Sequence, residues 1–303
     1  MIPPTLVPCV WLDDQAETAA SFYVRTFPGS RITGTSRYPR AVDNPAGRPR
    51  GSVLTVEIVV AGAPFTLLNG GPIFKLDPSL SFFVHVETAA EAERIFAVLE
   101  QGGRALMPIA SYPWSERYGW VQDRFGVSWQ VIADRRPPGG STIVPCLMFA
   151  GARHGRAEEA MKAWTAIFPC GRIVDVARYE EGEGPVGKVK HGRFSLAGQD
   201  LVAMDSHLAH GITFGEALSL QVRCGDQAEV DRYWEALSAG GKPGPCGWLQ
   251  DRFGLSWQVA PRRMEEWMIG PDAAVRDRVF AAMLRMGKLD LAALERAAGA
   301  SDN

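Results

Sequence analysis

The sequence predicts an α+β protein made of four consecutive β-α-β-β-β units followed by a helical tail. The first observation is a long internal repeat, because residues 119–131 return as 247–259 with eleven of thirteen positions identical. In both copies Asp-Arg-Phe-Gly is typical of a tight turn in which Gly takes a positive φ. The β-branched and aromatic residues that follow indicate a strand. The second observation is that the same order of strand and helix patterns occurs twice in each half, so we interpret the chain as a duplication.

Composition and charge define the class of protein. A length of 303 residues is enough for roughly two domains, and 46% hydrophobic with 22% charged residues is typical of a globular protein. The formal charge of -2 and the lack of a Lys/Arg run argue against nucleic-acid binding. No apolar run approaches the ~20 residues that cross a bilayer, and five cysteines without Cys-x-x-Cys spacing indicate reduced thiols. We therefore expect a cytoplasmic protein with no nucleic-acid or membrane partner.

The first unit starts with an apolar strand and ends with a hairpin. Asp13 and Asp14 supply turn and N-cap chemistry at the start of its helix, and Pro28-Gly29 stops that helix. The apolar residues of the helix recur on one stripe, whereas the other segments are β-like. We expect a strand at 6–12, a helix at 16–27, and strands at 31–37, 52–60 and 64–68.

The second unit repeats this order. Thr88 is a good N-cap for its helix, and Gly102-Gly103 terminates that helix. The closing segment is the repeated motif described above. We expect a strand at 80–86, a helix at 89–101, and strands at 104–107, 119–122 and 127–132.

The second half of the chain repeats the first, with insertions confined to connections. The first half has ten extra residues between Ala105 and Tyr118, where surface loops tolerate them. The Pro/Gly-rich segment 134–140 indicates a linker. We expect domains at 1–136 and 141–262 and a helical tail at 263–303. The tail is expected to cap the second half, and a dimer contact through its apolar stripe is the alternative.

The repeated units resemble a known superfamily. Tandem β-α-β-β-β units closed by an Asp-x-x-Gly-x-x-x-Gln hairpin resemble the vicinal oxygen chelate superfamily, which includes glyoxalase I, extradiol dioxygenases and bleomycin-resistance proteins. Phe-Pro-x-(Ser/Gly)-Arg-Ile, at 27–32 and 168–173, together with Gly-Trp-x-x-Asp-Arg-Phe-Gly-x-Ser-Trp-Gln, is similar to its PhnB-like branch, often labelled 3-demethylubiquinone-9 3-methyltransferase. The resemblance covers roughly 5–133 and 142–260. It implies that two units pair their sheets into a bowl, so each half is expected to form a complete glyoxalase-like bowl. The chain would then be a monomer that mimics a dimer, or would form a homodimer.

The resemblance also raises the question of a metal. In metal-bearing members each unit contributes one ligand from its first strand and one from its last. Carried onto this sequence, those places are Pro8, Phe65, Ser81 and Gln130, and Pro145, Leu201, Ser219 and Gln258. A register shift of one residue would bring in Cys9 and Cys146. Pro and Phe have no donor atom, and Ser and neutral Gln are weak ligands. We therefore expect no metal, and no cofactor, since no Gly-x-Gly-x-x-Gly joins a parallel strand to a helix as methyl-donor sites of that type require.

The first bowl is expected to be mostly apolar with a few neutral polar groups, which suits a small organic ligand. By alternation along its strands it displays Pro8, Val10, Phe65, Leu67, Asn69, Ser81, Phe83, His85, Ser128 and Gln130. The insertion adds Tyr112, Trp114, Arg117 and Tyr118. These either cover the edge of the bowl or form a lid, with Trp114 and Tyr118 stacking on a ligand and Arg117 pairing with an anion.

The second bowl is the weaker candidate because it lacks this insertion. It is expected to display Pro145, Leu147, Leu201, Ala203, Asp205, Ser219, Gln221, Arg223, Ser256 and Gln258. Asp205 and Arg223 could form a structural pair there. If one bowl alone is functional, we expect the first.

The sequence offers little catalytic chemistry. His85 is the titratable residue expected to point into the first bowl, the thiols of Cys9 and Cys146 have no evident activating cation, and Asp123 and Asp251 are turn residues. The favoured function is a metal-free protein that binds a small, mainly apolar or aromatic molecule. Two alternatives stay open: an enzyme of the same superfamily (lyase, isomerase or the labelled methyltransferase), and a structural or protein-interaction role that uses the tail.

Overall fold

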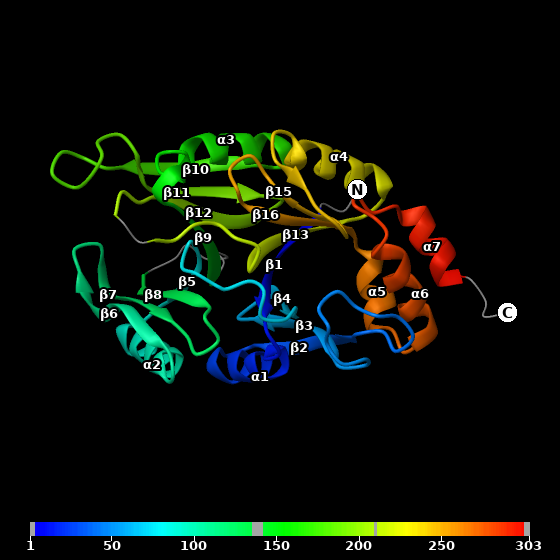
Figure 1. Ribbon diagram of the computed structural model, residues 1–303. Coiled ribbons are helices and arrows are strands. Elements are labelled where there is room, and N and C mark those ends of the chain that lie inside the picture. The colour runs from blue at the N-terminus through cyan, green and yellow to red at the C-terminus, as the bar shows by residue number, and fades with distance from the viewer. Residues whose placement is uncertain (1–3, 135–141, 209–210, 300–303) are drawn as a thin grey trace.

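The chain folds into four β-α-β-β-β modules, which form two eight-stranded sheets, and a helical tail (Figure 1). This description comes from a computed structural model and covers residues 4–134, 142–208 and 211–299. The predicted linker at 134–140 lies outside the described residues except for Asp134. The predicted α+β class with four repeated modules and a helical tail is confirmed.

Modules 1 and 2 make up the first half of the sequence. Module 1 consists of β1 (Thr5–Leu12), α1 (Ala16–Thr26), β2 (Arg31–Arg37), β3 (Val53–Val60) and β4 (Ala63–Asn69). Module 2 consists of β5 (Leu80–Val86), α2 (Ala89–Glu100), β6 (Arg104–Tyr112), β7 (Ser115–Gln122) and β8 (Ser128–Ala133). The ten-residue insertion does not form a separate loop but lengthens the hairpin of β6 and β7.

Modules 3 and 4 and the tail make up the second half. Module 3 consists of β9 (Ile143–Phe149), the short 3-10 helix η1 (Gly151–Arg153), α3 (Ala157–Ile167), β10 (Arg172–Arg178), β11 (Val189–Leu196) and β12 (Gln199–Asp205). Module 4 consists of β13 (Leu218–Cys224), α4 (Gln227–Ser238), β14 (Lys242–Pro243), β15 (Trp248–Gln250) and β16 (Ser256–Pro261). The tail holds α5 (Arg263–Ile269), α6 (Ala273–Met283) and α7 (Leu291–Gly299). No helix in the described part of the chain is long and apolar enough to span a bilayer.

The repeated motif folds as its sequence predicts. Asp123 Oδ1 accepts hydrogen bonds from the backbone N–H groups of Phe125 and Val127, which closes the turn before β8. Gly126 has a φ of 90°, a conformation that Gly adopts without the steric cost of a Cβ. Asp123 and Asp251 are therefore turn residues, as predicted, since Asp251 makes the equivalent two bonds in module 4.

The strands pair across the two halves of the sequence. Sheet A has the order β14-β15-β16-β13-β1-β4-β3-β2 and joins module 4 to module 1, whereas sheet B has the order β10-β11-β12-β9-β5-β8-β7-β6 and joins module 3 to module 2. The joints are antiparallel pairs, β1 with β13 and β5 with β9. The prediction that each half forms its own complete bowl is therefore wrong. The alternation within a strand fixes which face is buried, but it does not select the partner module.

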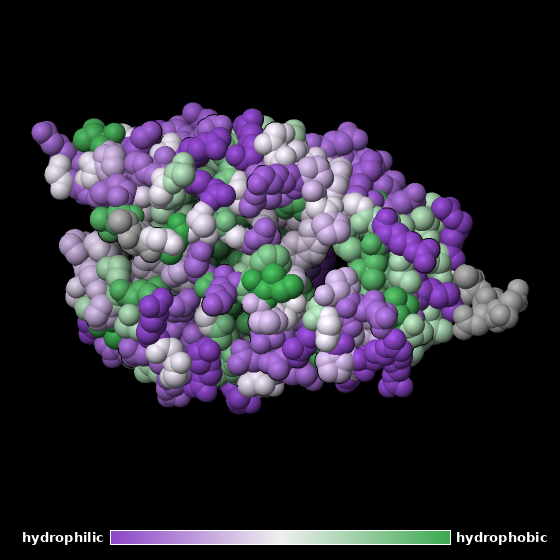
Figure 2. All heavy atoms as spheres, in the orientation of Figure 1, coloured by the Kyte–Doolittle hydropathy of each residue, from purple (hydrophilic) through white to green (hydrophobic). Residues whose placement is uncertain are grey.

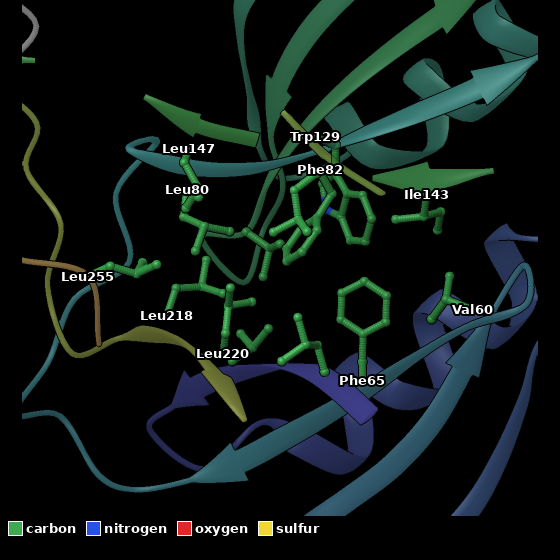
Figure 3. Packing of buried hydrophobic residues seen from close by; sticks show 14 of the residues in the cluster. Val60, Phe65, Leu80, Phe82, Trp129, Ile143, Leu147, Leu218, Leu220 and Leu255 are labelled. Carbon is green, nitrogen blue, oxygen red and sulfur yellow. The ribbon is translucent and has the colours of Figure 1, made fainter. Parts of the chain in front are cut away.

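The two sheets are held together by one shared core and by the helices that flank it. Figure 1 shows α1 and α2 along one side of the molecule and α3 and α4 along the other. The backs of the two sheets meet between them, and Figure 3 shows side chains of both sheets converging there. Phe65 of sheet A packs edge to face on Phe82 of sheet B, with ring centroids 4.9 Å apart. The Tyr23 hydroxyl also donates to Asp123, tying α1 to module 2.

The tail docks on sheet A and contacts both of its modules, so it is more than a cap on the second half. The α5 helix lies against β2 at Gly34, where a Cβ would approach the Cδ1 of Ile269 to 2.5 Å. Asp277 of α6 accepts hydrogen bonds from the backbone N–H groups of Arg40 and Ala41 in the loop after β2. The tail therefore bridges modules 1 and 4.

Candidate ligand site on sheet A

The two sheets have concave faces directed away from the shared core, which we call cup A on sheet A and cup B on sheet B. Cup A contains a cavity of about 330 Å³, a volume within the range of small-molecule sites. Its walls come from strands β1 to β4, β13, β15 and β16, from the loops that follow β2 and β4, and from the tail. The apolar lining includes Trp11, Leu54, Leu68, Trp248, Met268 and Phe280. In Figure 2 the surface is hollowed beside the tail helices.

In the first and last strands of modules 2 and 4, the side chains point to the faces that the sequence predicted. Ser81, Phe83, His85 and Gln130 lie on the concave face of sheet B, and Ser219, Gln221, Arg223 and Gln258 lie on that of sheet A. These are the faces expected from alternation. Pairing across the halves, however, assigns the two sets to different cups from those predicted. Ser128 and Ser256 precede the two glutamines on the same faces.

The first and last strands of modules 1 and 3 have the opposite orientation to the prediction. Val10, Phe65 and Leu67, and likewise Leu147, Leu201 and Ala203, lie in the core beneath the sheets. Pro8 and Pro145 share this face by alternation, so Cys9 and Cys146 face the cups instead. These strands are largely apolar on both faces, so alternation does not indicate which residues face the cup and which face the core.

Asn69 and Asp205 are structural residues at the ends of β4 and β12. The Asn69 side chain accepts a hydrogen bond from the Ala16 N–H at the start of α1 and donates one to the Val53 carbonyl. Asp205 accepts from the backbone N–H groups of Gly155, Ala157 and Val189. Both are buried, so neither is directed into a cup, and Asp205 does not pair with Arg223.

A hydrogen-bond network crosses the polar end of cup A. Arg223 Nη2 donates to Glu57 Oε2 at 2.6 Å and to Thr66 Oγ1 at 3.0 Å. Arg223 Nη1 donates to Glu265 Oε2 of α5 at 2.6 Å. Gln221 Nε2 donates to Gln258 Oε1, whose amide in turn donates to Ser219. The network joins the floor of the cup to the tail.

Burial controls the titration of two groups in this cup. It raises the pKa of the Cys9 thiol to about 12, so this thiol is protonated at neutral pH. Burial also raises the pKa of the Glu57 carboxyl, and the neighbouring Arg223 opposes this shift. The short contact to the guanidinium favours the charged pair in the folded protein.

Cup B is filled by its own side chains. Phe83, Tyr118, Trp120, Met148 and Val202 pack together there with at most 8% of each residue exposed. The Tyr118 hydroxyl donates to Gln130 Oε1, and that amide donates to Ser81. Tyr118 thus occupies the space that stays open in cup A.

The inserted hairpin belongs to sheet B, and the structure shows what its Trp114 and Arg117 contact. Trp114 is 58% exposed at the tip and stacks on Tyr112. Arg117 forms an ion pair with Glu93 of α2, on the helix side of sheet B. His85 lies at the rim of cup B, where its Nδ1 contacts Asp134 Oδ2 at 2.9 Å. The insertion is therefore remote from the cavity.

A metal of the kind that glyoxalase-like relatives hold does not fit cup A. The strands that would provide its ligands place Cys9, Thr66, Ser219 and Gln258 on the floor. The thiol is held protonated, the hydroxyls and the amide are weak ligands, and Glu57 is bound by Arg223. Within residues 4–134, 142–208 and 211–299, no three His, Cys, Asp or Glu side chains are placed to hold a metal.

A methyl-donor site on a glycine-rich turn does not fit either. Gly182-Glu183-Gly184-Pro185-Val186-Gly187 matches the letters of a Gly-x-Gly-x-x-Gly motif, but it joins the antiparallel strands β10 and β11. Such a site requires a parallel strand followed by a helix whose N-terminus meets the cofactor. The chain's own β1–α1 connection carries Asp13 and Asp14 instead.

Several lining residues were missed by sequence reasoning. Trp11 and Thr66 were missed because the opposite face of their strands was expected to point into the bowl. Glu57 was missed because β3 was not assigned to a bowl. Met264, Met268 and Met283 come from the tail. The helical spacing of the tail's apolar residues was the available signal for the last group, and it identified the helices without their position.

Comparison with known proteins agrees with the repeated modules. A family model described as 3-demethylubiquinone-9 3-methyltransferase matches residues 4–132 and again 141–260. Glyoxalase I from Zea mays has a TM-score of 0.54 at 13% identity over 86% of this chain and 93% of that chain. A proposed dioxygenase from Bacillus subtilis has a TM-score of 0.50 at 13% identity, over 95% and 94%. The PhnB protein from Bacillus cereus is 34% identical over 42% of this chain and 96% of its own, with a TM-score of 0.38. None of the curated proteins matches the chain.

Proposed function

The chain belongs to the 3-demethylubiquinone-9 3-methyltransferase family, and from this premise we propose that it binds a small apolar or aromatic molecule in cup A. The observation that carries the proposal is the cavity of about 330 Å³, walled by aromatic and aliphatic side chains with a polar network at one end. Sites for small organic ligands have this combination. Both cups are completed within one chain, which favours a monomer that mimics a dimer.

The apolar wall sets the scale of affinity that the cavity can provide. Burying about 200 Å² of apolar ligand surface gains roughly 5 kcal/mol at about 25 cal/mol per Å². Association itself costs several kcal/mol in lost freedom. Micromolar binding therefore requires that most of the ligand surface contact the wall. Trp11 and Trp248 contribute to this wall and pack edge to face, with ring centroids 6.1 Å apart.

The polar groups of the cup favour binding over chemistry. The Cys9 thiol is held protonated by burial, with a pKa of about 12. Glu57 accepts from Thr66 and Arg223, so it is not free to accept a proton from a ligand. The cup supplies neither an activated nucleophile nor a free base from these two residues.

The proposal is tested by filling the cavity. 1-Aminoanthracene is an uncharged aromatic probe whose fluorescence rises in apolar surroundings. We expect it to bind the wild-type protein and to bind Leu68→Trp at least tenfold more weakly, because Leu68 lines the cavity. Met204 occupies the equivalent position on β12 in cup B, so Met204→Trp is the matched control and should leave binding within twofold.

The outcomes separate the two cups. Equal weakening by both substitutions would place the probe elsewhere or indicate a general loss of structure, and thermal melting distinguishes these two causes. No binding by the wild-type protein would contradict the proposed function.

A further inference from the structure

The part of the cavity wall that the strands of sheet A do not supply comes from loops of modules 1 and 4 and from the tail. Met264, Met268, Ile269, Phe280, Met283 and Leu289 line the side opposite the strands. This segment lies outside both regions matched by the family model, the second of which ends at residue 260. The family modules thus form an open cup, and the tail of this chain covers it.

We propose that α5 and α6 form a lid over cup A, held closed by the Glu265–Arg223 ion pair, and that the lid encloses an uncharged hydrophobic molecule. This inference rests on the proposed function and adds how the ligand enters and which charge it carries. The two short helices lie between fixed ends, because the Arg262 N–H donates to the Cys224 carbonyl before α5, and the N–H groups of Cys246 and Gly247 donate to the carbonyls of Met286 and Gly287 after α6. The lid therefore opens by moving α5 and α6 between these two anchors.

The closeness of the lid depends on a glycine. Gly34 of β2 lets the Cδ1 of Ile269 lie 2.5 Å from the place of a Cβ, so any larger residue at this position requires the Ile269 side chain to shift. The equivalent position in module 3 is Asp175, which pairs with Arg193 as Gly34 pairs with Glu57. The two modules share one strand geometry, so an aspartate is compatible with this strand but would displace the Ile269 side chain of α5 from its present position. Module 1 is therefore adapted to receive the lid, and module 3 is not.

Between these backbone anchors, polar side chains join α5 and α6 to the modules at two places. Arg223 binds Glu57 of the cup and Glu265 of α5 with opposite ends of one guanidinium, each at 2.6 Å. Asp277 of α6 accepts from the N–H groups of Arg40 and Ala41 at 3.0 and 2.9 Å. Apart from these, the lid meets the cup through apolar side chains, three of which are methionines. Methionine is flexible and contacts aromatic rings favourably.

The charge of the cavity indicates the class of ligand. The charged residues in its lining are two acids, Glu57 and Glu265, and two arginines, Arg223 and Arg262. The formal charges cancel, and Arg223 is already paired with both acids. A charged ligand would lose its hydration and would have to compete with the contacts that Arg223, Glu57 and Glu265 already make with one another. An uncharged molecule has no such cost.

The first test measures how fast the probe exchanges. Glu265→Gln removes the negative charge of the attachment, which leaves at most a weaker neutral acceptor for Arg223, while Glu57 continues to balance Arg223. In stopped-flow fluorescence with 1-aminoanthracene, we expect its dissociation and association rates both to rise, the former about three- to tenfold. Glu266→Gln is the matched control, since Glu266 is on the same helix, has a 71% exposed side chain and does not line the cavity; its rates should stay within twofold. Equal rates in both variants and the wild type would overturn the lid.

The second test does not need a ligand. Gly34→Asp introduces the residue of module 3 at the contact with Ile269, and hydrogen exchange then reports the state of the lid. We expect the amides of α5 to exchange at least tenfold faster while those of β3 and β4 stay protected. Unchanged exchange in α5 would contradict the lid even if the probe binds. Faster exchange of the α5 amides in a protein that does not bind the probe would contradict the proposed function and support the lid.

The third test concerns the charge of the ligand. Anthracene-2-carboxylate has the ring system of 1-aminoanthracene and adds a negative charge. We expect it to displace 1-aminoanthracene at least tenfold less effectively than uncharged anthracene-2-methanol does. Equal displacement by the two compounds would show that the site accepts an anion and would overturn the assigned class.

Discussion

Cups A and B are built on equivalent strands in the same order, yet cup A holds a cavity and cup B is filled by side chains. The repeated motif aligns Cys246 in cup A with Tyr118 in cup B. Gln221 and Phe83 also correspond, since each pairs in register with the glutamine of its motif. In cup B the phenol of Tyr118 bonds that glutamine, whereas in cup A the partner is the amide of Gln221. The difference teaches that a few side chains, rather than the backbone, decide whether a cup is open.

The same comparison extends to the rim. Cup A is closed by the tail, and its Arg223 bridges Glu57 and Glu265. The corresponding residue in cup B is His85, which contacts Asp134 at the end of its own module. Cup B therefore has no attachment for a lid among these residues and needs none, because its interior is already packed. An interior as dense as an organic crystal gives stability, while an open one leaves room for a ligand.

The largest expected effect comes from emptying cup B. Tyr118→Ala removes a ring that is 6% exposed and should destabilise the protein by about 3–5 kcal/mol. Cys246→Ala removes one half-buried sulfur beside an existing cavity and should cost about 1 kcal/mol or less. Urea denaturation of the two variants measures both values. Similar losses would mean that the two cups are packed alike.

A milder variant separates the ring from its hydroxyl. Tyr118→Phe keeps the packing and removes the bond to Gln130 Oε1, so a loss of about 1 kcal/mol in unfolding free energy is expected.

If Tyr118→Ala leaves a stable opening in cup B, 1-aminoanthracene should bind with a stoichiometry that rises from one toward two per chain. A stoichiometry that stays at one indicates that cup B collapses around the deletion.

The next effect concerns access to two equivalent cysteines. Burial raises the pKa of Cys9 and of Cys146 to about 12, so both thiols are almost entirely protonated at pH 8. Cys9 lines the cavity, whereas Cys146 lies within the packed side chains of cup B. Methyl methanethiolsulfonate, which is small and uncharged, should therefore modify Cys9 about tenfold faster. Peptide mapping by mass spectrometry measures the ratio, with the exposed Cys170 as a reference.

Equal rates at Cys9 and Cys146 would show that both react through global unfolding. That result would contradict an accessible cavity in cup A. Addition of 1-aminoanthracene should slow Cys9 and leave Cys146 unchanged, since the probe competes for the same space.

The orientation of a strand could be predicted from the sequence where its two faces differ in polarity. In β8, Ser128 and Gln130 alternate with Trp129 and Val131, so one face is polar and the orientation could be predicted. In β1 both faces are apolar, and the residues that face the cup could not be separated from those that face the core. The turn at Asp123 and Gly126 was predictable because it depends on local chemistry alone.

The partners of the modules were not predictable for a different reason. Every module has nearly the same pattern, so pairing 1 with 4 leaves the same residues buried as pairing 1 with 2 would. The tail presents a similar problem, because its apolar spacing predicts helices without indicating where they dock. Gly34 becomes informative only once its close contact with Ile269 is known.

The smallest expected effect tests whether the polar network belongs to cup A alone. Thr66 and Val202 occupy equivalent places on β4 and β12, beside the partners Glu57 and Arg193. Thr66→Val replaces a hydroxyl that bonds Glu57 and Arg223 by a methyl group of the same shape, and a loss of about 1 kcal/mol in unfolding free energy is expected. Val202→Thr is the reverse exchange and should also cost about 1 kcal/mol, because it buries a hydroxyl among the apolar side chains of cup B. A stabilising effect of either exchange in urea denaturation would mean that the polar and apolar interiors are interchangeable, and the difference between the cups would then have no energetic basis at this position.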